Sequence, residues 1–157
     1  MKLLLSFYLF ATVIFTQFLA AYFFSKGRIS YRKAFSALAF CISVYLFGYL
    51  MILNNSNLQE LIFWNQIQYL GLPFISVLWM TVAFLYTKTI YKLNKRMTVL
   101  FFFVPAITFL MRLTNPWHHL FYINWEVKQF AGYHTLYMER GYWYYVCRNV
   151  WYSFTAG

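Results

Sequence analysis

The sequence predicts an all-α polytopic membrane helix bundle, with about five transmembrane helices and the N-terminus outside. Hydrophobic residues make up 62% of the 157 residues and charged residues only 10%, against about 45–50% and about 25% in soluble domains. The apolar residues form continuous runs, whereas a β-barrel needs alternating segments of about ten residues. Positive charge gathers in two short loops between these runs, which is typical of membrane helices.

The first helix is expected near residues 3–24. This run meets the length of about 20 apolar residues that a helix needs to cross roughly 30 Å of hydrocarbon. The preceding Lys2 also fits the start of a signal peptide, but the run continues through Phe23 and Phe24 with no small-x-small cleavage site. A retained helix is therefore favoured.

Four further apolar runs predict the remaining helices, and together with the first they form a single membrane domain over residues 1–157. The runs cover residues 34–53, 61–86, 97–113 and 141–157, with a long outer loop at 114–140. The last run is still apolar at its final residue. We therefore expect a chain that is truncated after its fifth helix.

Loop charge sets the predicted orientation. The loops after the first and third helices carry eight basic residues and no acid: Lys26, Arg28, Arg32, Lys33, Lys88, Lys92, Lys95 and Arg96. The loop after the second helix has no Lys or Arg, and the outer loop mixes both signs. By the positive-inside rule the two basic loops are cytoplasmic, so only Lys2 argues against an outside N-terminus. The net charge of +10 thus reports topology and excludes nucleic acid as a partner.

Polar residues interrupt the outer half of the third helix. Asn65 and Gln68 are three residues apart and share one helix face. Two interpretations stay open: a polar cavity that takes a ligand, or amides that bond to neighbouring helices and contribute about 0.6–2 kcal/mol each.

Two arginines lie near the outer ends of the last two helices. Arg148 is seven residues into the fifth run, where ionisable residues are functional candidates by default. Its long side chain could also snorkel to the outer interface. Arg112 is one residue from the end of the fourth run, and we expect an interfacial anchor there.

The outer loop holds all three histidines: His118, His119 and His134. Adjacent histidines are not the i, i+4 pair with which a helix presents two ligands to one ion. The cysteines, Cys41 and Cys147, lie in apolar runs and are expected to pack as small hydrophobes. We therefore expect no metal and no cofactor. Aromatic residues of the loop are interpreted as an interfacial belt: Trp117, Phe121, Tyr122 and Trp125.

Several motifs, taken in chain order, carry a resemblance to a known family. They are the run from Phe63 to Thr87 with its FW, YxG, proline and closing Tyr-Thr, then Pro105, then LTNPWHHLFY at 113–122, then Gly132, and GYWYYVCRNVWYSF at 141–154. From about Ala34 onward the chain resembles the N-terminal seven-transmembrane sensor region of bacterial histidine kinases and related diguanylate cyclases.

The resemblance implies seven helices, an outside N-terminus and a cytoplasmic C-terminus followed by a signalling output domain. No ATP-binding, phosphoacceptor or GGDEF-like motif is present here, so we expect a sensory module that is not an enzyme and has no catalytic residues. The resemblance also places Thr114, Asn115 and His118 on the family's TN-x-x-H positions. It makes them candidates for shaping or reading the outer surface.

The favoured function is a membrane receptor of a two-component or related system, located in the cell membrane with multiple passes. Its candidate ligand surface is Asn65, Gln68, Thr114, Asn115, His118 and Arg148. Expected partners are the lipid bilayer, a small extracellular ligand or peptide, and a second copy through the membrane helices. The alternatives are a small membrane enzyme, which would need a nucleophile with a base or a metal cluster, a transporter fragment, or a non-signalling remnant.

Overall fold

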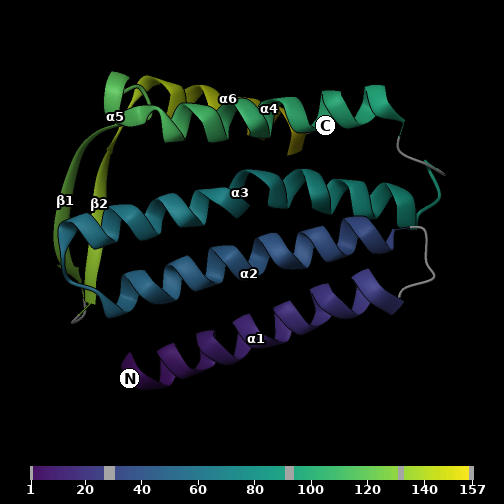
Figure 1. Cartoon of the computed structure of the whole chain (residues 1–157). Helices are drawn as coiled ribbons and strands as arrows, with labels where there is room; N and C mark the ends of the chain where they lie inside the picture. The colour runs from purple at the N-terminus through teal and green to yellow at the C-terminus, as the bar shows by residue number, and fades with distance from the viewer. Residues whose placement is uncertain (1, 27–30, 91–93, 131–132, 156–157) are drawn as a thin grey trace.

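The computed structural model describes residues 2–26, 31–90, 94–130 and 133–155. Within these residues, four helices are long and apolar enough to cross a membrane: α1 (Lys2–Lys26), α2 (Arg32–Asn54), α3 (Leu58–Tyr86) and α4 (Lys95–Leu113). Each helix packs beside the next in chain order (Figure 1). The predicted all-α polytopic membrane bundle is confirmed.

The predicted outer loop contains regular structure that the sequence did not predict. It begins with the short helix α5 (Asn115–His118) and continues as strands β1 (Tyr122–Phe130) and β2 (Tyr133–Arg140), which pair as an antiparallel hairpin. Aromatic and β-branched residues alternate with polar ones in β1, and these residue types favour strands. The chain then enters α6 (Tyr142–Thr155), which corresponds to the predicted fifth helix.

Close approach of α2 and α3 depends on two glycines. A Cβ on Gly71 would overlap the backbone carbonyl oxygen of Cys41, and one on Gly48 would meet the Gln68 side chain and the Trp64 carbonyl. Small residues at such contacts are typical of membrane helix pairs, where packing rather than hydrophobic burial holds helices together.

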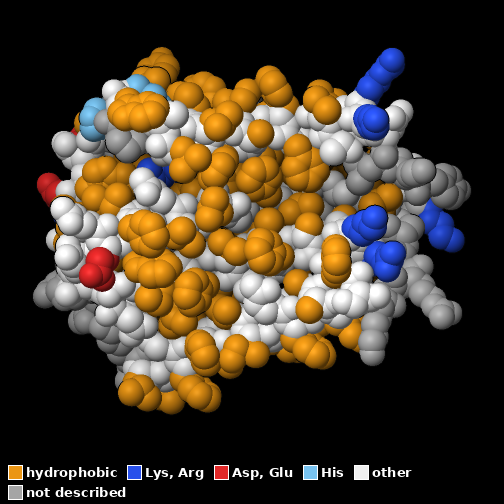
Figure 2. Space-filling view, viewed as in Figure 1, with side chains coloured by type: hydrophobic (Ala, Val, Ile, Leu, Met, Phe, Trp, Pro, Cys, Tyr) orange, Lys and Arg blue, Asp and Glu red, His pale blue; other side chains and the backbone are white. Residues whose placement is uncertain are grey.

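The long helices present apolar side chains outward. Large exposed hydrophobic side chains occur along α1, α3 and α4, for example Phe7, Trp79 and Phe103. Figure 2 shows hydrophobic side chains spread over the broad face in view. A soluble monomer rarely exposes so large an apolar surface, whereas a surface of this kind suits contact with lipid.

The charged residues lie at the two ends of the bundle. Arg32 and Lys33 start α2, and Lys95 and Arg96 start α4, at the end opposite the hairpin (Figures 1 and 2). Arg28 and Lys92 lie outside the described residues. The orientation stays a prediction from the positive-inside rule: the basic end is expected to be cytoplasmic and the hairpin end outside, and the two ends are named accordingly.

Candidate functional site

The β1–β2 hairpin covers the outer ends of the helices. It runs from the end of α4 across α3 toward α2 (Figure 1), and β2 contacts both α2 and α3. The pairing of Tyr122 with Arg140 and of Trp125 with Met138 leaves one extra residue on β1 between them. Such a bulge redirects side chains on the bulged strand.

A buried arginine forms the centre of the outer end. Arg112 is only 1% exposed, and its Nη2 donates to Oδ1 of Asn65 at 2.6 Å. Its guanidinium carbon lies 5.1, 5.0 and 4.8 Å from the ring centroids of Tyr69, Tyr122 and Trp125. Desolvated contacts of this kind contribute about 2 kcal/mol or more. They hold α3, α4 and β1 together.

The prediction that Arg112 is an interfacial anchor is therefore wrong. The side chain turns inward because three aromatic rings and an amide replace the water around its guanidinium. The belt interpretation is also wrong for Phe121 and Tyr122, which are buried, while Trp117 is exposed as a belt residue would be.

Two of the predicted site residues, Asn65 and Gln68, lie on α3 and are linked to Arg112 of α4. Asn65 and Gln68 are both buried, and Nδ2 of Asn65 donates to Oε1 of Gln68 at 3.4 Å. The amide of Asn65 thus bridges Arg112 and Gln68. A second link from α3 to the hairpin is the hydrogen bond between the hydroxyls of Tyr69 and Tyr122.

Asn115 holds the chain between α5 and β1. Its Oδ1 accepts hydrogen bonds from the backbone N–H groups of Phe121 and Tyr122 at 2.8 and 3.0 Å, and its Nδ2 donates to the Tyr122 carbonyl at 3.0 Å. The side chain is buried, and both its oxygen and its nitrogen are hydrogen-bonded to the backbone of the same chain. Asn115 therefore positions Tyr122 beside Arg112.

Thr114 and His118 form a second local group of hydrogen bonds. Nδ1 of His118 accepts a hydrogen bond from the Leu120 N–H at 3.1 Å, which assigns the proton of the neutral ring to Nε2. That nitrogen donates to Oγ1 of Thr114 at 2.9 Å, and Oγ1 donates to the Leu110 carbonyl at 2.9 Å. The TN-x-x-H segment thus fixes the turn that joins α4 to the hairpin.

The remaining predicted candidates are not part of this network. Arg148 is exposed on α6, with its guanidinium carbon 5.2 Å from the Tyr145 ring centroid. The side chains of His134 and Cys147 lie outside the described residues. Within the part of the chain that the structure describes, no three His, Cys, Asp or Glu side chains are grouped so that they could hold a metal ion.

The turn before β1 also contacts the start of α6. The N–H of Gly141 donates to the Phe121 carbonyl at 2.8 Å, and the N–H of Trp143 donates to the Leu120 carbonyl at 3.0 Å. No side chain could replace Gly141 without a shift, because a Cβ there would overlap the Leu120 carbonyl. A movement of this turn would therefore move α6.

Burial changes the electrostatics of the hairpin residue that contacts Arg112. It raises the pKa of the Tyr122 hydroxyl, and the hydrogen bond with Tyr69 and the charge of Arg112 oppose this only in part. The acids lie elsewhere: Glu126 pairs with Lys128 at 3.7 Å, and Glu139 accepts a hydrogen bond from Asn124. Among the described residues, Arg112 has no carboxylate partner.

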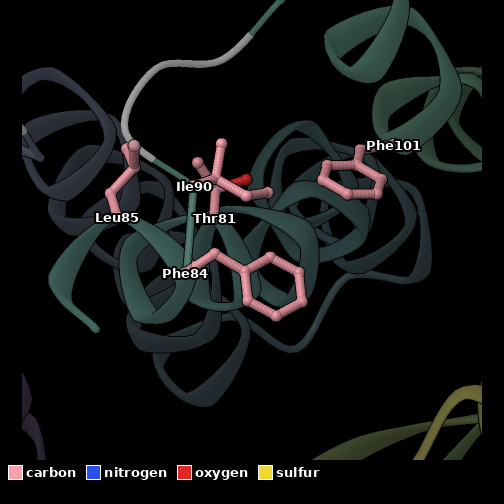
Figure 3. A pocket seen from close by; sticks show the side chains of 5 residues that line it. All are labelled: Thr81, Phe84, Leu85, Ile90 and Phe101. Atoms are coloured by element: carbon pink, nitrogen blue, oxygen red, sulfur yellow. The ribbon is translucent and has the colours of Figure 1, made fainter. Parts of the chain in front are cut away.

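A separate apolar recess near the cytoplasmic end is less suited to a ligand. Thr81, Phe84, Leu85, Ile90 and Phe101 line it (Figure 3), and its empty space is about 150 Å³. Sites for drug-sized ligands measure about 300–1,000 Å³. The recess also has no charged or amide side chain in its lining, whereas the outer network contains a buried arginine and two buried amides on α3. The outer network around Arg112 is therefore the better candidate site.

The four membrane-capable helices and the ordered hairpin end define a polytopic membrane module. The family model described as the N-terminal 7TM region of histidine kinase matches residues 8–157. The chain belongs to this family, so it is a membrane sensory module of a signalling protein and a multi-pass protein of the cell membrane. No curated protein and no solved structure matches it.

Proposed function

We propose that the outer end of the bundle is the sensing site, where a small extracellular ligand or peptide changes how the hairpin sits on α3 and α4. One observation carries this proposal. Arg112 lies at the junction of three elements and contacts Asn65 on α3 and Trp125 on β1. A ligand that binds one arrangement of these elements more tightly than another shifts the population between them.

The change would reach α6 through the turn at the start of β1. Tyr122 contacts Arg112, and the adjacent Phe121 accepts the hydrogen bond from Gly141. Helix α6 therefore receives any displacement of the hairpin and can transmit it toward the cytoplasmic side.

These residues supply sensing without catalysis. Residues 1–157 contain membrane helices and the outer hairpin but no kinase or cyclase motif. We propose that they do not signal alone, and that output requires the further helices and the output domain of a complete signalling protein. Pairing with a second copy through the exposed apolar faces is part of the same proposal.

A reporter assay tests this function. Cells would express the chain within its complete signalling protein, either unchanged or with Arg112→Gln, together with a reporter for the output. We expect Arg112→Gln to change the basal or stimulated output at least about tenfold, because it removes the charge that joins the three elements. The matched control is Trp79→Phe, on the exposed face of α3, which should leave output unchanged.

Two results would contradict the proposal. Unchanged output in Arg112→Gln, with protein present in the membrane at the normal level, would exclude Arg112 from sensing. Output from residues 1–157 alone would show that no further helices or output domain are needed.

A further inference from the structure

The buried cluster around Arg112 contains hydrogen-bond donors that lack acceptors. Nε of Arg112 and Nε1 of Trp143 are both buried without a hydrogen-bond partner. Trp143 packs against the same aromatic cluster of Tyr69, Phe121 and Tyr122, of which the two tyrosines contact Arg112. Buried donors are nearly always paired in folded proteins, so two unpaired donors in one cluster require an explanation.

The two tyrosines contribute a third unmatched proton. The hydroxyls of Tyr69 and Tyr122 share one hydrogen bond, which uses the proton of one hydroxyl only. The proton of the other hydroxyl has no acceptor among the described contacts. The cluster therefore holds donors that have no partner among the described contacts.

Charge points in the same direction. Arg112 is buried, and its polar contact is with the neutral amide of Asn65. The three acids of the chain, Glu60, Glu126 and Glu139, are exposed. Removing a guanidinium from water without a counter-charge is costly, and an anion beside Arg112 would offset that cost.

We infer that this cluster binds a small organic carboxylate with an apolar body. The inference rests on the proposed sensing function and names its ligand class. A carboxylate carries one negative charge against the single guanidinium, and its two oxygens match the donor fork of an arginine. The surrounding rings favour an apolar body over a strongly hydrated anion.

The hairpin supplies the route of entry. Trp125 covers Arg112 from the bulged part of β1 and is only partly buried. A two-stranded hairpin has little stability of its own, and the charge pairing of an incoming carboxylate with Arg112 would offset the loss of the contact between Trp125 and Arg112. The carboxylate then takes the place of the indole and accepts hydrogen bonds from Arg112 and Trp143.

Equilibrium dialysis with labelled phenylacetate tests this site on the full chain in lipid nanodiscs. We expect saturable binding with a Kd of about 1 mM or tighter. The neutral analogue 2-phenylethanol should bind at least about tenfold more weakly because it lacks the charge. Inorganic phosphate, which lacks the apolar body, should not compete at equal concentration.

Three variants locate the binding. Trp143→Phe removes one unpaired donor but keeps an aromatic ring, and it should weaken phenylacetate binding about tenfold. Arg112→Gln should abolish saturable binding, and its thermal unfolding reports whether it remains folded. Trp79→Phe removes an exposed indole N–H far from the cluster and should bind like the unchanged chain.

The inference is overturned if phenylacetate binding fails to saturate, if inorganic phosphate competes as well as unlabelled phenylacetate, or if Trp143→Phe binds normally. These failures are distinct from failure of the sensing function. A reporter that responds to Arg112→Gln while no carboxylate binds would leave the sensing site in place and remove this ligand class.

Discussion

Arg112 and Asn65 join α4 to α3 by a hydrogen bond of 2.6 Å between Nη2 and Oδ1. Both side chains are buried. The bond satisfies one donor of the guanidinium but leaves its charge uncompensated, because an amide is neutral. A carboxylate in place of the Asn65 amide would therefore compensate that charge from within the protein.

Asn65→Asp should keep or raise the thermal stability of the protein, whereas Asn65→Ala should lower its free energy of unfolding by about 1–3 kcal/mol. Aspartate retains the acceptor and adds the missing negative charge, and the Gln68 amide can turn to present its NH₂ group. Alanine leaves a buried guanidinium with one partner fewer. Thermal unfolding of the purified variants in one detergent compares them.

The same substitution also bears on the ligand. The carboxylate that Asn65→Asp introduces would pair with Arg112 and neutralise its charge. Phenylacetate binding should therefore fall at least about tenfold while the protein stays folded. If Asn65→Asp is less stable than Asn65→Ala, the guanidinium does not lack a counter-charge.

Tyr122 gives a pH dependence whose sign follows from its burial. Burial raises the pKa of the Tyr122 hydroxyl above the value of about 10 that it has in the unfolded chain. The folded protein therefore keeps this proton to higher pH. The stabilisation is fully present below about pH 10 and is lost as pH rises toward the folded pKa.

The measurement compares the unchanged chain with Tyr122→Phe. The variant should be less stable at neutral pH by about 1 kcal/mol, because it loses the bond to Tyr69. Between about pH 9 and 11 its melting temperature should fall less steeply than that of the unchanged chain. Equal slopes would show that Tyr122 titrates as it does in the unfolded chain.

The parts of this structure that depend on local spacing could be predicted from the sequence. Long apolar runs predict α1 to α4 because helix length is set by bilayer thickness. The contact between Asn65 and Gln68 follows from the i, i+3 geometry of one helix. Both relations need only residues that are close in the chain.

The environment of Arg112 could not be predicted in this way. Its partners Tyr122 and Trp125 come from a hairpin, and only the pairing of β1 with β2 and the bulge bring them over α4. The strand itself was missed because its aromatic residues also fit an interfacial belt. One signal was available: an ionisable residue within a membrane segment is a functional candidate by default, and that rule applies to Arg112 as well as to Arg148.

His118 can be tested with a matched pair of substitutions. Asparagine places its Oδ1 near the position of the histidine Nδ1, which accepts from the Leu120 N–H. Glutamine reaches the position of Nε2, which contacts Thr114. His118→Asn should therefore preserve the turn before β1, and His118→Gln should preserve only the link to Thr114.

Hydrogen exchange at the Leu120 amide distinguishes the two. We expect protection in His118→Asn to stay within about threefold of the unchanged chain, and protection in His118→Gln to fall by about tenfold, as a lost hydrogen bond of ordinary strength would cause. Equal protection in both variants would mean that the bond to Nδ1 does not hold this turn.

Gly141 tests whether the outer turn controls α6. Its N–H donates to the Phe121 carbonyl, and a Cβ at this position would overlap the backbone carbonyl of Leu120. Because backbone cannot yield as a flexible side chain can, Gly141→Ala should separate the start of α6 from the turn and cost about 1–3 kcal/mol of stability. In the complete signalling protein it should also change basal output while membrane insertion remains normal. Tyr142→Ala, at an adjacent and exposed side chain, is the control, and an equal effect of the two substitutions on output would refute a specific role for the contact between Gly141 and Leu120.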